Sequence, residues 1–105
     1  MTRREREGAE PQEAPRSVRL DVLLHHLCLA KSRSQAAQWI EDGAVQVNDK
    51  PARASAPVRV SDAVRVAAGR RTRVYEILAL PARGVSRAQA PTYYRLLMDD
   101  DSAIA

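Results

Sequence analysis

Apolar side chains between residues 18 and 29 recur with the spacing of one face of a helix. They fit the i, i+3, i+4, i+7, i+8 pattern, at Leu20, Leu23, Leu24, Leu27 and Cys28. The opposite face carries Asp21, Val22, His25 and His26. The pattern predicts an amphipathic helix over about residues 18–29, with its apolar positions buried.

A second helix is predicted only a few residues later. Ser32 followed by Gln35 fits a capping box, in which a hydroxyl and an amide satisfy two free N–H groups at a helix start. The buried stripe of this helix consists of Ala36, Ala37 and Ile40. Gly43 is suited to the left-handed stop just past a helix end. Because the connection is short, the two helices are expected to pack as a helix-turn-helix pair.

After Gly43 the apolar period changes to two, which is the spacing of strands. Alternating valines occur at Val45 and Val47, at Val58 and Val60, and at Val64 and Val66. Asn48–Asp49 and Ser61–Asp62 supply turn residues between these runs, and residues 70–80 form another strand candidate. The predicted fold class is α+β, with a helix-turn-helix-like pair packed on a small, mostly antiparallel β-sheet.

The chain is predicted to have three parts. Residues 1–16 are charged and nearly free of large apolar groups, which predicts a disordered tail. Residues 17–80 hold the predicted domain, and residues 81–105 form a C-terminal extension. In this extension Pro91 is suited to a helix start, and the acidic residues 99–101 are expected to fray at its end. The residues expected to dock this helix are Tyr94, Leu97 and Met98.

The segment 18–80 contains ten Lys or Arg against six Asp or Glu, and so accounts for the whole net charge of +4. A basic folded segment indicates a polyanionic partner, foremost a nucleic acid. The single cysteine excludes an internal disulfide. The sequence lacks a signal peptide and the roughly 18 consecutive apolar residues of a membrane helix. We therefore expect a cytoplasmic protein without a membrane partner.

Cations gather where the second helix is predicted to begin. Lys31 and Arg33 flank the capping Ser32, although the partial positive charge of a helix N-terminus disfavours cations there. A bound anion such as phosphate removes this repulsion, and the free N–H groups of a helix start bind anions readily. Arg16 and Arg19, at the start of the first helix, add to this field if the helices pack side by side. Surface cations around an ordinary capping serine are the alternative interpretation.

Several short motifs together resemble the S4 RNA-binding domain. They are, in chain order, Arg19-Leu20-Asp21 with Leu24, Lys31-Ser32-Arg33-Ser34 with Ala36, Ile40 with Gly43, Val45, Val47 and Asn48, and Val58 with Val60, Asp62 and Val64. Weaker likeness over residues 73–80 and 83–94 extends the resemblance to the small stand-alone, ribosome-associated heat-shock members of that family. The resemblance covers about residues 17–97.

This resemblance implies an RNA-binding surface made by the first helix, the start of the second and the adjoining hairpin. Carried over by position, its residues are Arg19, Lys31, Ser32, Arg33, Ser34, Gln35, Asn48 and Lys50, and the charge pattern adds Arg16. Asp21 is expected to orient an arginine or a backbone group, because a carboxylate repels phosphate. Such a surface suits structured RNA, which proteins bind largely through its shape and backbone.

The sequence departs from the family pattern at two turns, where Asp49 and Ser61 replace the usual glycines. Asp adopts the left-handed conformation at modest cost, so the first hairpin turn is expected to survive. The stand-alone members often have aromatic residues in the first helix, where this chain has Leu24 and His25. A weaker affinity or a different RNA target is therefore expected if those aromatic residues contact RNA.

Other chemistry is weakly indicated. His25, His26 and Cys28 lack the fourth ligand of a structural zinc site. Cys28 lies on the apolar stripe, which favours a buried small hydrophobe over a nucleophile. Trp39 is suited either to stacking on a base or to covering the core. We therefore expect no metal, no cofactor and no small-molecule substrate.

The sequence thus predicts a non-catalytic, monomeric protein that binds ribosomal RNA or a ribosomal subunit, and the resemblance further implies rescue or recycling of stalled subunits. One alternative is an RNA-binding accessory to an RNA-modifying enzyme such as a pseudouridine synthase, although 105 residues leave little room for a catalytic domain. A helix-turn-helix DNA binder is a second, disfavoured by the apolar Ala36–Ile40 segment. An adaptor for an acidic protein is a third.

Overall fold

The structure is a computed structural model that describes residues 15–101. Residues 1–14, which make up most of the predicted N-terminal tail, lie outside the described range. The elements are, in chain order, β1 Val18–Arg19, α1 Leu20–His26, α2 Arg33–Glu41, β2 Val45–Val47, β3 Lys50–Pro51, β4 Pro57–Val58, β5 Ala63–Ala68, β6 Arg71–Ile77, the 3₁₀ helix η1 Ala90–Tyr93 and β7 Tyr94–Asp101.

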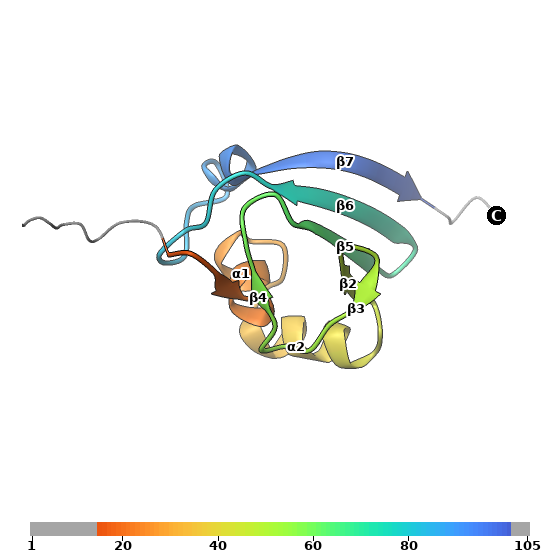
Figure 1. The fold of residues 1–105 in the computed structure, drawn as a ribbon. Coiled ribbons are helices and arrows are strands. Elements are labelled where there is room, and N and C mark those ends of the chain that lie inside the picture. The colour runs from red at the N-terminus through yellow and green to blue at the C-terminus, as the bar shows by residue number, and fades with distance from the viewer. Residues whose placement is uncertain (1–14, 102–105) are drawn as a thin grey trace, which may run out of the picture.

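Five strands form one sheet in the order β3-β2-β5-β6-β7, and every pairing in it is antiparallel. β1 and β4 pair separately as a short antiparallel ribbon. Figure 1 shows β6 and β7 at the top, above α1 and α2, with the β1–β4 ribbon beside α1. The predicted class, a helix-turn-helix-like pair on a mostly antiparallel sheet, is confirmed.

α1 begins later than predicted, because Val18 and Arg19 are extended and pair with β4. Val18 lies opposite Val58 in this ribbon. The N–H of Leu20 then donates to the carbonyl of Ala56 at 2.9 Å. The first turn of α1 therefore bonds to the chain just before β4, and this satisfies N–H groups that a helix start leaves free.

α1 also ends earlier than predicted, at His26. Cys28 has a φ of 61° and occupies the left-handed position just past the helix end. The N–H of Leu29 donates to the carbonyl of Leu24 at 2.9 Å across this stop. The left-handed residue leaves the helical stripe, so Cys28 is exposed and the prediction of its burial was wrong.

α2 begins and ends as the sequence predicts. The Ser32 hydroxyl accepts a hydrogen bond from the N–H of Gln35 at 3.0 Å. The Gln35 side-chain oxygen accepts one from the N–H of Lys31 at 2.7 Å, so the return bond of this capping box goes to the residue before the cap. Gly43, with a φ of 80°, follows the helix end. The buried residues of α2 are Ala36 and Ile40.

The helices and the sheet share one aliphatic core. Its largest fully buried side chains are Leu20, Leu23, Leu24, Leu27, Val45, Val58, Val64 and Ile77. β5 alternates strictly, with Val64 and Val66 buried and Arg65 exposed. Since successive strand residues point to opposite faces, Arg65 lies on the sheet face away from the helices. The predicted burial of the four leucines of α1 and its flank is confirmed.

The two turns that lack the usual glycine keep a left-handed backbone. Asn48 and Asp49 have φ values of 53° and 67°, and Ser61 has 81°. The prediction that Asp49 tolerates this conformation is confirmed. The N–H of Asn48 donates to the carbonyl of Ala63 at 2.8 Å, which ties the first turn to the start of β5.

The C-terminal extension differs from the predicted docked helix. Pro91 does lie in the first turn of η1, but the chain then becomes strand β7 and pairs with the free edge of β6. Tyr94 packs edge-on against Tyr75, with ring centroids 4.8 Å apart. Leu97 and Met98 are exposed, because they project from an edge strand instead of facing the core from a helix.

The acidic end of the extension is likewise structured at Asp99. Its carboxylate accepts hydrogen bonds from Arg71 at 2.9 Å and from Arg73 at 3.3 Å, both on β6. These ion pairs are exposed and bring little stability singly. The position of the acidic residues is therefore set mainly by the backbone pairing of β7 with β6, and less by these ion pairs.

Leu24→Ala is expected to lower the free energy of unfolding by about 2–5 kcal/mol, because it opens a cavity in the core. Urea denaturation followed by circular dichroism measures the loss. The matched control is Leu97→Ala on β7, where the side chain is 52% exposed. We expect this control to change the stability by less than about 0.5 kcal/mol. Equal losses in the two variants would contradict the core described above.

Candidate nucleic-acid interface

A buried carboxylate joins the starts of the two helices. Asp21, in the first turn of α1, is only 4% exposed, although the sequence pattern places it on the face opposite the apolar stripe. It accepts two hydrogen bonds from the guanidinium of Arg19, at 3.2 and 3.3 Å. It also accepts one from Arg33, the first residue of α2, at 3.5 Å. The expectation that Asp21 orients arginines fits this geometry.

The two arginines stay available to a partner although they share a carboxylate. The side chains of Arg19 and Arg33 are 51% and 55% exposed, whereas that of Asp21 is 6% exposed. Two cations on one anion leave a net positive charge, and it lies on the solvent side. Asp21 therefore spaces and orients the two guanidiniums without cancelling them.

The carboxylate stays ionised in this setting. Burial alone would raise the pKa of Asp21. The hydrogen bonds from Arg19 and from the backbone N–H of Val22 outweigh that effect and lower the pKa. The positive charges of Arg19 and Arg33 lower it further. At neutral pH the group therefore carries the charge that holds both arginines.

The start of α2 presents N–H groups without a protein acceptor. The N–H groups of Gln35 and Ala36 bond to Ser32, through its hydroxyl and its carbonyl. In residues 15–101 no acceptor is found for the N–H groups of Arg33 and Ser34. Such groups, together with the helix dipole, bind anions. At the start of α1, the N–H groups of Leu20 and Asp21 already bond to carbonyls of the protein. The N–H groups that could bind an anion therefore lie at the start of α2.

Lys31 completes this cluster. It is exposed, and within the described part of the chain no carboxylate lies within ion-pair distance of its ammonium group. We call Arg19, Lys31, Ser32, Arg33, Ser34 and Gln35 the basic cradle. The structure brings these six predicted residues together at the helix starts. What they bind remains a prediction.

The other predicted residues lie apart from the basic cradle. Arg16 is exposed just before β1. Asn48 and Lys50 are exposed on the β2–β3 hairpin, which follows the C-terminal end of α2. The Asn48 amide bonds to Asp62 and to the N–H of Ala63, at 3.1 and 3.0 Å. Asn48 thus fixes the hairpin turn, whatever else it contacts.

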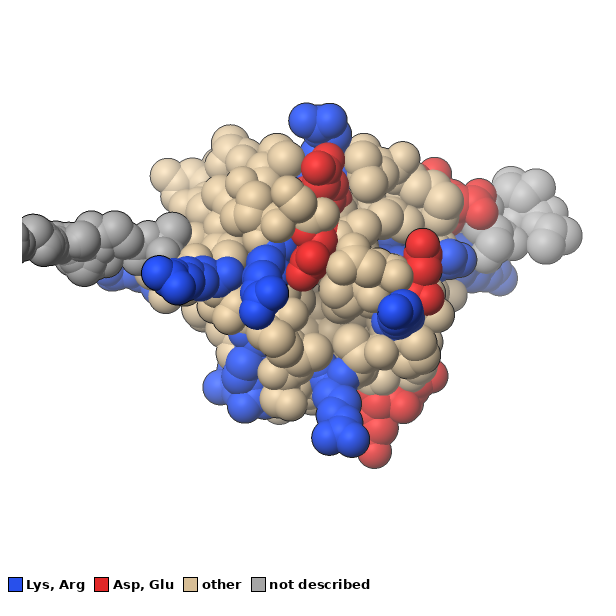
Figure 2. All heavy atoms as spheres, in the orientation of Figure 1, with Lys and Arg blue, Asp and Glu red and all other residues tan. Residues whose placement is uncertain are grey.

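Basic and acidic side chains are intermixed on the face that Figure 2 shows. Lys and Arg side chains lie at the top, left, bottom and right of this face, with Asp and Glu side chains among them. The basic cradle is therefore defined by the contacts described above and not by a separate basic face.

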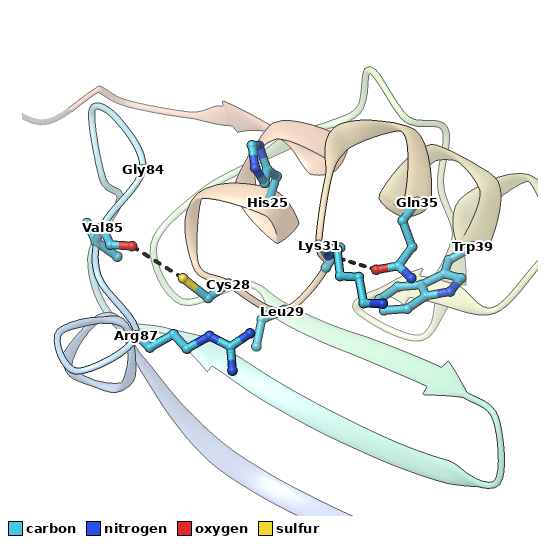
Figure 3. A pocket seen from close by; sticks show the side chains of 10 residues that line it. His25, Cys28, Leu29, Lys31, Gln35, Trp39, Gly84, Val85 and Arg87 are labelled. Carbon is cyan, nitrogen blue, oxygen red and sulfur yellow. Dashed lines mark hydrogen bonds between the residues drawn. The ribbon is translucent and has the colours of Figure 1, made fainter.

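Sequence reasoning missed Arg87 of the C-terminal extension. Its loop is fixed to the end of α1, because the N–H of Val85 donates to the His26 carbonyl at 3.1 Å. The Cys28 thiol also bonds to the Val85 carbonyl, at 3.3 Å. Arg87 thereby lines a hollow that Lys31 also lines (Figure 3). The only sequence signal was the weak family likeness around residues 83–94.

Comparison with known proteins identifies a family that part of the chain resembles. The family model of the S4 domain matches residues 18–64. Residues 18–64 are therefore similar in sequence to an S4 domain. The match runs from β1 into β5 and so includes both helices and the β2–β3 hairpin. The basic cradle lies within the matched residues.

A solved structure resembles more of the chain than the S4 domain alone. It is the trimeric Heat Shock Protein 15 of Vibrio cholerae, with a TM-score of 0.72 and 26% sequence identity. The likeness covers 76% of this chain and 81% of that protein. No curated protein sequence matches the chain. The likeness to the stand-alone heat-shock type, predicted from short motifs, is confirmed.

The search for other chemistry gives two further findings. In residues 15–101 no group of three or more His, Cys, Asp or Glu side chains is placed to hold a metal ion. Within the same range, no helix is long and apolar enough to span a membrane. The match to the S4 domain is the clearest functional indication among the described residues.

Asp21 predicts a specific pH dependence of stability. A carboxylate with a lowered pKa stabilises the fold above its unfolded pKa of about 3.9, and this contribution is lost as the pH falls through the folded value. Asp99 also has a lowered pKa, through hydrogen bonds from Arg71 and Arg73. The contribution of Asp21 to the free energy of unfolding must therefore be obtained as the difference between wild type and a variant. The free energies of unfolding of wild type and Asp21→Asn are therefore compared by urea denaturation.

We expect this difference to be constant above about pH 5 and to shrink steadily below about pH 4. The control Asp49→Asn, at an exposed hairpin position, should show no such convergence. A difference between wild type and Asp21→Asn that does not change with pH would contradict the assigned role of the carboxylate.

Proposed function

We propose that this protein binds structured RNA, specifically ribosomal RNA or a ribosomal subunit, through the basic cradle. The observation that carries the proposal is the pair of arginines from α1 and α2 on one buried carboxylate, inside a domain of an RNA-binding family. Lys31 and the free N–H groups of Arg33 and Ser34 add donors of the kind that phosphates accept.

The proposed mode of binding is electrostatic and largely independent of base sequence. The guanidiniums of Arg19 and Arg33 point from a rigid anchor, so little side-chain entropy is lost when a phosphate joins them. A-form RNA hides its base edges in a deep, narrow groove, and its phosphate backbone is the accessible feature. A cradle of fixed cations suits the shape of such a backbone.

The protein is proposed to act as a binder and not as an enzyme. The S4 domain and the likeness to Heat Shock Protein 15 support this. By the same likeness we propose a cytoplasmic, ribosome-associated role, with rescue or recycling of stalled subunits as its most specific form. The predicted monomer is to be checked by sedimentation equilibrium, because the similar Vibrio cholerae protein is trimeric.

The salt dependence of RNA binding tests this mode directly. If Arg16, Arg19, Lys31, Arg33 and Lys50 each neutralise one phosphate, the logarithm of the binding constant should fall with the logarithm of the salt concentration, at a slope of about −3.5 to −4.5. Fluorescence anisotropy with a labelled, folded ribosomal RNA fragment measures the slope. A slope near zero would contradict electrostatic binding.

A pair of matched double variants locates the contacts. Lys31→Gln with Arg33→Gln removes two cradle cations, so the slope should become shallower by about 1.4–1.8. The control, Arg65→Gln with Arg95→Gln, removes two exposed cations from the sheet face away from the helices. It has the same net charge and should keep the wild-type slope.

Equal changes in the two double variants would mean that the cradle is not the site. Circular dichroism confirms that each variant is folded. A DNA duplex of the same length as competitor addresses the helix-turn-helix alternative, and stronger competition by DNA than by RNA would contradict the proposed function.

A further inference from the structure

A hollow of about 480 Å³ adjoins the basic cradle, between the end of α1, α2 and the loop that carries Arg87 (Figure 3). Its volume lies within the roughly 300–1,000 Å³ of small-ligand sites. Lys31 and Arg87 are its cationic residues, and no acidic side chain of residues 15–101 lines it. The hollow is therefore suited to an anionic ligand.

One side of the hollow is aromatic. Trp39 of α2 is partly buried and packs against the core, and it also lines the hollow. Trp39 and Leu29 line a second, smaller hollow of about 170 Å³ as well, against the sheet face at Val66 and Tyr75. The indole of Trp39 therefore packs against the core and also lines both hollows, where a flat ring could stack on it.

Polar groups along the hollow complete a nucleotide-like pattern. Gln35 lines it, and the Gln35 side-chain oxygen already accepts a hydrogen bond from the N–H of Lys31, which leaves the amide NH₂ group as a donor. His25 lines it too and is exposed. A nucleotide offers what these groups take: a flat π-system, polar base edges and a phosphate.

The loop that brings Arg87 to the hollow is firmly attached. Val85 is tied to α1 by two hydrogen bonds, one from its N–H to the His26 carbonyl and one to its carbonyl from the Cys28 thiol (Figure 3 shows the second). The left-handed backbone of Cys28 turns its side chain toward this loop. Arg87 therefore faces Lys31 across the hollow as a consequence of the fold.

We propose that this hollow binds an unpaired nucleotide of the RNA held in the basic cradle, with the base against Trp39 and a phosphate between Lys31 and Arg87. The inference rests on the proposed RNA binding. Lys31 and Gln35 belong to both the cradle and the hollow, so one RNA strand can pass from the first to the second. The C-terminal extension, beyond the matched S4 residues, thereby contributes to RNA recognition.

Trp39 makes a direct test possible, because it is the only tryptophan in the sequence. Two RNA hairpins with the same stem serve as probes, one fully paired and one with a single-nucleotide bulge. We expect the bulged hairpin to quench Trp39 fluorescence at saturation, since a stacked base changes the emission of the indole. The paired hairpin should bind through the cradle with little quenching.

Variants identify the side chains that carry the preference. Trp39→Leu removes the ring on which the base is proposed to stack. It should therefore weaken binding of the bulged hairpin by about 5- to 150-fold, measured with labelled RNA. It should leave the paired hairpin almost unaffected. Arg87→Gln, at an exposed position, should also reduce the preference for the bulge. The control Arg83→Gln changes an exposed arginine nearby in the same segment that does not line the hollow.

Several results would overturn this inference. If both hairpins bind equally, without quenching and with no effect of Arg87→Gln, the hollow is not a nucleotide site, and RNA binding by the cradle still stands. Quenching by adenosine monophosphate, with no preference for the bulge, would assign the hollow to a free nucleotide instead. If neither hairpin binds, the proposed function fails and this inference fails with it.

Discussion

The arrangement of the basic cradle, the proposed RNA-facing surface, depends on one buried carboxylate. A charge out of water is costly unless it is paired and hydrogen-bonded, and Asp21 meets both conditions through Arg19, Arg33 and the N–H of Val22. Since Arg19 precedes α1 and Arg33 begins α2, the same contacts set how the two helix starts lie beside each other. The short connection between the helices and the aliphatic core beneath them hold this geometry in place.

The rest of the fold supports that surface from behind. The N–H groups of Leu20 and Asp21 in α1 bond to the chain before β4, and Ser32 caps α2. In residues 15–101, the N–H groups of Arg33 and Ser34 at the start of α2 have no acceptor and lie among the cations. The C-terminal extension adds β7 to the sheet and places Arg87 at the hollow that Lys31 also lines. The residues that match the S4 domain are thus followed by a segment that the family model does not match, and our inference gives that segment a place in binding RNA.

Local patterns predicted what depends on local chemistry. The capping of α2, the stop at Gly43 and the alternation of β5 follow from nearest neighbours and were predicted. Tertiary contacts changed the rest. The β1–β4 ribbon shortened α1, and two arginines brought Asp21 into the interior. The free edge of β6 recruited residues 94–101 as a strand, although Pro91 and the apolar spacing favoured a helix. Arg87 lines the same hollow as Lys31, and no spacing in the sequence indicates that these two residues share a site.

The central claim is that RNA phosphates bind where α2 begins, between Arg19, Lys31 and Arg33. Amide proton–nitrogen NMR spectra recorded during titration with a folded ribosomal RNA fragment test it most directly, because each backbone N–H reports its own surroundings. The account predicts the largest shift changes at the free N–H groups of Arg33 and Ser34. Changes confined to the outer sheet face, around Arg65, with Arg33 and Ser34 unmoved, would contradict it.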